Sequence, residues 1–372
     1  MTGPSRSVDG PETPMTAVAT ESAVVLCCGS GGVGKTTTAA VIALEAARAG
    51  RRAVVVTIDP AKRLADALGL GELTNTPTLI EGPWPGELSA LMLDTESTFN
   101  GLVARYSGST EQAEKILSNR FYRNISGALS GTQEYMATEK LYELSSEGDF
   151  DLIVVDTPPT RNALDFLEAP GHLARFLSHP LYRIVTAPTR GIVKAVNLAA
   201  QPLLRGVAKV VGGEVIADAI AFFTAFDGME EGFKQRALLV EQLLADDSTS
   251  FVLVASPRRD TVAEAAYFAQ RLGDMGLTVR AVVVNRIHPL FWRGDDDELT
   301  ACAKNAPPDS AFVDHVSNLI DFTEIARSER SHLAPLQELV APAPLAEVPL
   351  LPFEVHDLDN LTALGDHLFG RT

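Results

Sequence analysis

Residues 29–36 have the types and spacing that bind phosphate. They read Gly-Ser-Gly-Gly-Val-Gly-Lys-Thr, follow a short apolar run and precede an alanine-rich helical pattern. Glycines let the backbone turn tightly and point consecutive N–H groups inward, which forms a nest for an anion at the positive end of the next helix. Lys35 then reaches the terminal phosphates, and the Thr36 hydroxyl can bind Mg²⁺. The sequence therefore predicts a nucleotide-binding loop.

A carboxylate follows a second apolar run. Residues 152–155 are Leu-Ile-Val-Val, and Asp156 comes directly after them. Nucleotide-hydrolysing proteins place at such a strand end the carboxylate that holds Mg²⁺, usually through a water molecule. Strands also end in Asp because that residue favours turns. Since the phosphate loop is predicted on a neighbouring strand, we interpret Asp156 as a metal carboxylate.

Asp59 is the third candidate acid, and the residues around it leave two roles open. It ends the next apolar run and precedes Pro60. An acid at this point can orient or deprotonate a water molecule that attacks the γ-phosphate. It can equally cap a helix that has Pro60 in its first position. We include Asp59 with Thr36 and Asp156 among the residues expected around Mg²⁺.

Apolar runs and helical segments alternate along the chain. Several of the runs are apolar without alternation, as in strands buried on both faces of a parallel sheet. The expected strands are residues 23–28, 53–58, 89–93, 152–155, 251–255 and 279–284. Helical segments at about 95–148 and 180–245 are expected to be insertions. The predicted fold is α/β, a P-loop NTPase with a doubly wound, mainly parallel sheet, in which residues 21–372 form one domain behind a disordered tail of residues 1–20.

The composition limits the class of partner and the compartment. The formal charge of −17 over 372 residues argues against nucleic acid as a main partner, because phosphate backbones require clustered Lys and Arg. The first 20 residues contain no apolar segment of signal-peptide length. The three cysteines offer neither a disulfide framework nor a Cys-x-x-Cys metal pair. We therefore expect a cytoplasmic protein.

Five motifs in order give a specific resemblance. They are Gly-Gly-Val-Gly-Lys-Thr-Thr at 31–37, Asp-Pro-Ala at 59–61, Asp-Thr-Pro-Pro-Thr at 156–160, Val-Asn-Arg at 284–286 and Val-Pro-Leu-Leu-Pro-x-Glu-Val at 348–355. Together they resemble the arsenical-pump ATPase family, which includes the ATPases that target tail-anchored membrane proteins. The resemblance covers about residues 21–372.

The resemblance implies a dimeric, Mg²⁺-dependent ATPase whose two ATP sites face each other across the subunit interface. Asp59 would position the attacking water, Asp156 and Thr160 would belong to a second switch, and Asn285 would read the adenine edge. Pro349 and Leu350 would wall the base. The residues implied to bind the phosphates and Mg²⁺ are Gly31, Gly32, Val33, Gly34, Lys35, Thr36 and Thr37.

The chain departs from the family at one charged position. The family's loop normally carries a second lysine that crosses the interface to the partner's nucleotide, and this chain has Ser30 there. The resemblance is closest to actinobacterial members that work as pairs of unlike subunits. It implies a heterodimer with a paralogue that keeps the lysine, or else a slow homodimer. The cysteine pairs that bind arsenite or zinc in the family are missing, so arsenite transport is poorly supported.

The function that we predict is ATP binding and hydrolysis that changes the conformation of a dimer and acts on a protein or membrane partner. One alternative is a nucleotide-gated binding subunit with little hydrolysis of its own, and another is a partitioning-type ATPase. Residues 184–226 contain helix-spaced apolar side chains. These side chains either hold a hydrophobic client helix or a membrane surface, or pack within the protein.

Overall fold

The protein is built around one eight-stranded sheet. A computed structural model describes residues 14–59, 63–120, 132–178, 228–305 and 311–371, with isolated positions between 214 and 225. The strand order is β3-β4-β2-β5-β1-β6-β7-β8, and every pair is parallel except β3 with β4. The predicted α/β class with a mainly parallel sheet is confirmed.

The strands follow the apolar runs. Their bounds are β1 Val24–Cys28, β2 Arg52–Thr57, β3 Thr78–Ile80, β4 Glu87–Met92, β5 Leu152–Asp156, β6 Thr249–Ala255, β7 Val279–Ile287 and β8 Leu345–Pro349. Every residue of β1 and β5 is buried, as a run without alternation predicts for central strands. Sequence analysis missed β3 and β8, the two edge strands, which are short and only partly buried.

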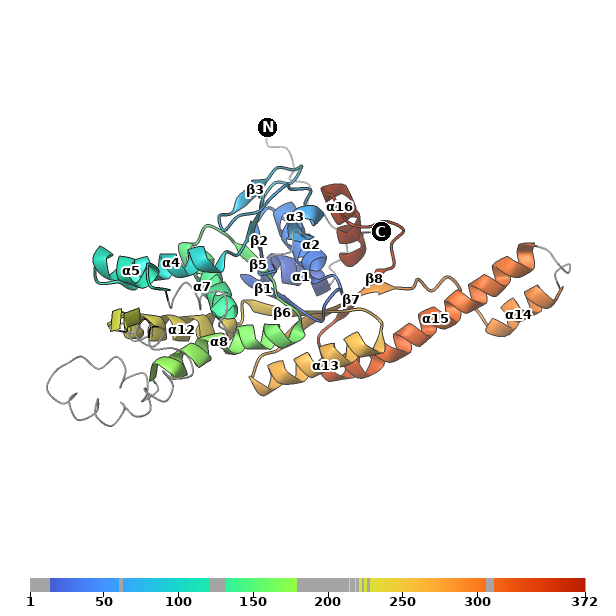
Figure 1. Cartoon of the computed structure of the whole chain (residues 1–372). Coiled ribbons are helices and arrows are strands. Elements are labelled where there is room, and N and C mark those ends of the chain that lie inside the picture. The colour runs from blue at the N-terminus through green and yellow to red at the C-terminus, as the bar shows by residue number, and fades with distance from the viewer. Residues whose placement is uncertain are drawn as a thin grey trace, which may run out of the picture.

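Helices cover both faces of the sheet (Figure 1). On one face lie α1 Pro14–Glu21, α2 Lys35–Arg48, α3 Arg63–Ala67 and α16 Leu358–Leu368, whose apolar side chains share a core with Val25 and Cys27. The other face is covered by α7 Thr132–Glu147, α8 Thr160–Ser178, α12 Glu230–Leu244, α13 Arg259–Asp274 and α15 Ala311–Val340, which pack on Leu26 and Cys28. Successive residues of β1 thus enter opposite cores, so the sheet is doubly wound.

The predicted disordered tail is wrong for residues 14–20. They belong to helix α1, and Met15, Val18 and Ala19 are buried in the core shared with α2. The spacing of these three residues places them on one helical face, which packs against the sheet. Arg51 secures the end of α1 by donating to the Ala19 carbonyl oxygen at 2.6 Å. Residues 1–13 lie outside the described part of the chain.

The first predicted insertion contains α4 Thr95–Tyr106, α5 Thr110–Leu117 and α7. Together with Phe222 and Phe233 they build a third apolar cluster away from the sheet. The described part of the second insertion is mainly α12. Residues 179–213, which include most of the apolar segment 184–226, lie outside the described residues. Within the described ranges, no helix combines the length and apolar character needed to cross a membrane.

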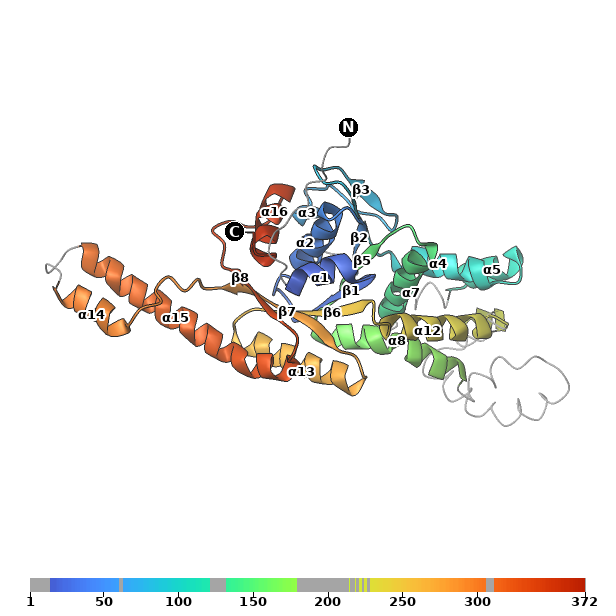
Figure 2. The same ribbon diagram turned by 180° about the vertical axis from the view of Figure 1, so that it is seen from behind.

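The chain also contains a long helical pair that sequence analysis did not predict. Helix α14 spans Asp296–Asn305, and the 30-residue α15 continues to Val340 and packs on α13. Figure 2 shows α14 and the first half of α15 projecting from one side of the sheet, opposite to α4, α5 and α12. The second half of α15 returns the chain to β8, which brings the 350–357 segment to the glycine-rich loop.

Candidate nucleotide site

The candidate site lies where the central parallel strands end. Strand β5 pairs with both β1 and β2, so that Asp156 stands beside Cys27 on one side and Thr57 on the other. The loop 29–34 leaves the end of β1 and enters α2 at Lys35. This edge of an open parallel sheet is where ligands bind in α/β proteins.

The glycine-rich loop has a backbone that side chains would disrupt. Gly34 is the residue before α2 and has φ 101°, in the left-handed region. A Cβ at Gly34 would collide with the amide of Asn285, which donates through Nδ2 to the Val33 carbonyl oxygen at 2.9 Å. Strand β7 therefore braces the loop from the side. The Val33 side chain is buried in the core, so that residue offers the site only its backbone.

Asp156 is the centre of the hydrogen bonds at the site. Its Oδ2 accepts from the Thr36 hydroxyl at 2.7 Å and from the Thr57 hydroxyl at 3.0 Å. Only 2% of the residue is exposed. Burial raises the pKa of Asp156, while the two hydroxyl groups and the nearby Lys35 act in the opposite direction.

Lys35 is the matching buried cation. Its Nζ donates to the Ser30 carbonyl oxygen at 2.8 Å, and 8% of the residue is exposed. Burial lowers the pKa of Lys35, and the Asp156 carboxylate partly restores it. A cation and a carboxylate are thus both buried at this site, where electrostatic attraction is stronger than in water.

Asp59 lies at the entrance rather than in the interior. Its Oδ2 is 3.6 Å from Nη1 of Arg63, the first residue of α3, and its backbone N–H donates to the Thr57 hydroxyl. Residues 60–62 lie outside the described ranges, so the capping role with Pro60 is not tested. The preceding carbonyl, of Ile58, accepts from Gln133 Nε2 at 3.0 Å, which connects this segment to the first turn of α7.

Eight predicted residues meet in a single cleft of about 330 Å³. They are Gly31, Gly32, Gly34, Lys35, Thr36, Thr37, Asp59 and Asp156. Arg63, Arg286 and His356 also line this cleft and were not predicted as site residues. Arg286 directly follows Asn285 in the Val-Asn-Arg motif and has a positive φ of 62°, so the motif itself was the signal that could have found it.

A second cleft of about 620 Å³ continues from the first. The predicted adenine residues Asn285, Pro349 and Leu350 line it, together with the 351–356 segment and Leu364 of α16. The two clefts share Gly34, Thr37, Arg286, Val355 and His356. A ligand with phosphates in the first cleft would therefore extend directly into the second.

Ser30 is unusual for its lack of a partner. In the described part of the chain, Ser30 Oγ is the buried side-chain N or O atom that no hydrogen bond satisfies. Only 7% of the residue is exposed. The position at which the resembled family carries an interface-crossing lysine thus holds a short, buried side chain in this chain.

The cysteines at the edge of the site are structural. Cys27 and Cys28 are buried, and burial raises the pKa of Cys28 to about 12, which leaves its thiol protonated and unreactive at neutral pH. No group of three His, Cys, Asp or Glu side chains with metal-site geometry occurs among the described residues. The Thr36 hydroxyl beside one carboxylate fits Mg²⁺ instead, because this ion usually takes one or two protein ligands and completes its shell with phosphate and water.

Comparison with known proteins identifies the family. The sequence profile of the anion-transporting ATPases matches residues 22–329. The chain belongs to this family. The match begins just before β1, includes the glycine-rich loop and Asp156, and reaches into α15.

Relatives from distant organisms resemble most of the chain. The "ATPase ASNA1 homolog" of Dictyostelium discoideum is 24% identical over 306 residues, 78% of this chain and 78% of its own. The "ATPase GET3" of Malassezia globosa is 23% identical over 347 residues, 92% and 90% of the two chains. The "ATPase ARSA2" of Chlamydomonas reinhardtii is 30% identical over 262 residues, 70% and 66%. These family members are ATPases by name, which supports nucleotide binding at the cleft.

Replacing Asp156 by Asn is expected to separate stability from nucleotide binding. The pKa of Asp156 is higher in the folded than in the unfolded protein, so ionisation of this acid opposes folding. This destabilisation is absent below the unfolded pKa and grows as pH rises through the folded pKa. At pH 7 Asp156→Asn should therefore raise the melting temperature of the ligand-free protein, by roughly 2 °C or more. The further rise that Mg²⁺ and ATP produce in the native protein should disappear.

Asp151→Asn is the matched control for this experiment. Asp151 is half exposed, and Arg52 lowers its pKa through hydrogen bonds and charge. Its contribution to stability is present above the unfolded pKa, so the variant should melt slightly lower and keep the full ligand-induced shift. An Asp156→Asn protein that is less stable without ligand, or that keeps the shift, would contradict the assignment.

Proposed function

We propose that the chain is a Mg²⁺-dependent ATPase whose hydrolysis changes the conformation of a dimer. The observation that carries the proposal is the convergence of Lys35, Thr36 and Asp156 at the wall of one cleft that opens into a second, base-sized cleft. Family membership supports the ATPase activity itself.

Different groups of the chain are proposed to bind the phosphates and the metal. Backbone N–H groups of the glycine-rich loop and the start of α2 surround the phosphates, and Lys35 exchanges its contact with the Ser30 carbonyl for the terminal phosphates. Thr36 and Asp156 hold the metal side, with Thr57 orienting the carboxylate. A bound Mg²⁺ would supply positive charge that offsets the negative charge of the phosphates.

Asp59 is proposed to orient the attacking water. It lies on the same cleft as Lys35 and Asp156, is less buried than either, and pairs with Arg63 in this state. An acid that positions water contributes to the rate of the chemical step and little to nucleotide affinity. The hydrogen bond from Gln133 to Ile58 gives this segment a route to α7 and the helical insertion.

A partner subunit is proposed because this chain has Ser30 where the loop of the resembled family carries a second lysine. Ser30 supplies no charge, so we infer pairing with a paralogue that carries lysine at this position, with a homodimer as the alternative.

The dimer would act on a hydrophobic protein segment or a membrane protein in the cytoplasm. The helical insertions are the proposed contact, since α7 connects them to the nucleotide cleft. The charge of −17 still argues against nucleic acid.

Asp59→Asn is expected to keep ATP binding and lose hydrolysis. The Kd for ATP with Mg²⁺ should change by less than about threefold, while turnover falls about 100-fold, since one water-positioning group is removed. Calorimetric titration and a phosphate-release assay measure the two quantities.

Lys35→Ala provides the contrast, because it should lose binding and hydrolysis together. If Asp59→Asn instead weakens ATP binding as strongly as Lys35→Ala, the acid holds the nucleotide and not the water.

A second candidate function is a nucleotide-gated binding subunit with little hydrolysis. The unpartnered Ser30 hydroxyl favours it, because the position holds no group that could stabilise transition-state charge on a partner's nucleotide. The two candidate functions predict different effects on ATP turnover when Ser30 is replaced by lysine.

Ser30→Lys is expected to raise turnover of this chain alone at least about tenfold if the missing cation limits a hydrolytic homodimer. The measurement is phosphate release as a function of protein concentration, and Ser30→Gln, a long side chain without charge, is the control. Tight ATP binding with no turnover in either variant would instead favour the gated binding subunit.

A further inference from the structure

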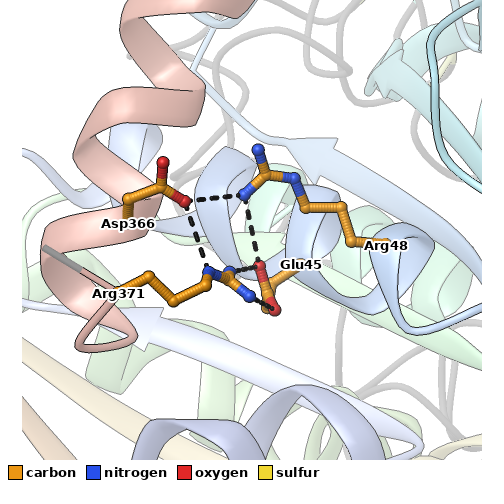
Figure 3. Close-up of polar contacts among 4 residues, drawn as sticks. All are labelled: Glu45, Arg48, Asp366 and Arg371. Atoms are coloured by element: carbon orange, nitrogen blue, oxygen red, sulfur yellow. Dashed lines mark hydrogen bonds and ion pairs between the residues drawn. The ribbon is translucent and has the colours of Figure 1, made fainter. Parts of the chain in front are cut away.

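Four charged side chains join α2 to the C-terminal end of the described chain. Glu45 and Arg48 come from the last turns of α2, while Asp366 lies on α16 and Arg371 follows it (Figure 3). We call these four residues the terminal clamp. Arg371 donates to the two carboxylate oxygens of Glu45 through Nη1, at 2.8 Å, and Nη2, and its Nε lies 3.3 Å from Asp366. Arg48 bridges the same acids, at 3.1 Å from Asp366 and 3.7 Å from Glu45.

The terminal clamp is partly shielded from solvent. The Glu45 side chain is 10% exposed and the Arg371 side chain 29%, and the two are linked by a two-pronged contact. Such bidentate arginine–carboxylate pairs fix geometry as well as charge. Leu361, Leu364 and Leu368 of α16 pack in the core that α2 also enters. Helix α16 is therefore tied to α2 by apolar packing along its length and by ion pairs at its C-terminal end.

The segment between β8 and α16 forms one wall of the base-sized cleft. Residues 350–356 line that cleft, together with Leu364 of α16. None of residues 350–357 is fully buried. Leu351 and Val355 are partly buried and pack against the core that α2 and α16 share, and the segment is also held at its two ends. At one end the Leu350 N–H donates to the Ile287 carbonyl at 2.8 Å, and at the other Asp357 caps α16.

The opposite wall belongs to α2. Gly34 and Thr37 line the same cleft, and α2 begins between them at Lys35. The two walls are thus carried by α2 and α16, the helices that the clamp joins. The four clamp residues are not among the residues that line either cleft.

We propose that Arg371 is a positioning residue for the nucleotide base: through the terminal clamp it holds α16, and with it the 350–357 wall, at the distance from α2 that accepts the base. The proposal rests on the proposed function, because it presumes a nucleotide in these clefts. It predicts that the clamp affects affinity for the base-containing part of the ligand and leaves the phosphate grip unchanged.

The test compares ATP with inorganic tripolyphosphate, both with Mg²⁺, by calorimetric titration of the full chain. Arg371→Ala should raise the Kd for ATP about tenfold, the size expected when a few binding side chains lose their preorganisation. The Kd for tripolyphosphate should change by less than about twofold. Arg258→Ala, which removes an exposed ion pair with Asp260 at the start of α13, is the matched control and should alter neither, because both residues are absent from the lining of the two clefts.

Arg371→Lys is the second variant, in case Arg371→Ala does not fold. It keeps the charge but loses the two-pronged contact, and it should shift ATP affinity in the same direction by about threefold. Unchanged ATP affinity in the folded variants would overturn the proposal. Equal weakening of ATP and tripolyphosphate would also overturn it, because the clamp would then support α2 and its loop as a whole. Lys35→Ala distinguishes a failure of the proposed function: if that variant binds both ligands as the native protein does, the clefts are not the nucleotide site.

Discussion

The site depends on one buried pair of opposite charges at the carboxyl edge of the sheet. Asp156 ends the central strand β5, and Lys35 opens the helix that leaves the neighbouring strand β1. Burial opposes the charged form of each, which shows in the raised pKa of the acid and the lowered pKa of the lysine. Hydroxyl groups from Thr36 and Thr57 compensate the acid. Lys35 and Asp156 are already in position before a polyanion and a hard cation enter the cleft. Folding has therefore already arranged these charges, and binding does not have to rearrange them.

The rest of the structure keeps the loop and its surroundings in register. Parallel pairing sets Asp156 beside Cys27 and Thr57 without freedom to slip, since a one-residue shift would exchange the two apolar cores. Asn285 braces the loop from β7, and the return of the chain through α15 and β8 brings the 350–357 segment alongside it. The terminal clamp then fixes α16 against α2. The two clefts thereby share Gly34 and Thr37 at the start of α2, together with residues 355–356.

Much of the sheet and of the phosphate site is predictable from local sequence. The central strands are unbroken apolar runs in the sequence. The glycines before Lys35 indicate a tight backbone turn at that point. Edge strand β8 was missed because Glu347 and Pro349 interrupt its apolar character, and α1 because its three core residues stand next to a polar, proline-rich stretch. The ion pairs between Arg371 and Glu45 join positions 326 residues apart, and no local pattern encodes such a contact. His356 likewise enters the cleft through tertiary folding, whereas Arg286 belongs to the Val-Asn-Arg motif at 284–286.

The most direct test of the account is the effect of Mg²⁺ on the affinity of the native chain for ATP. Titration calorimetry with Mg²⁺ and then with excess EDTA measures it, since Thr36 and Asp156 are the residues that would hold the cation in the proposed function. The account predicts that ATP binds at least about tenfold more tightly with Mg²⁺ than without. Equal affinity under the two conditions, or no binding of ATP in either, would contradict it.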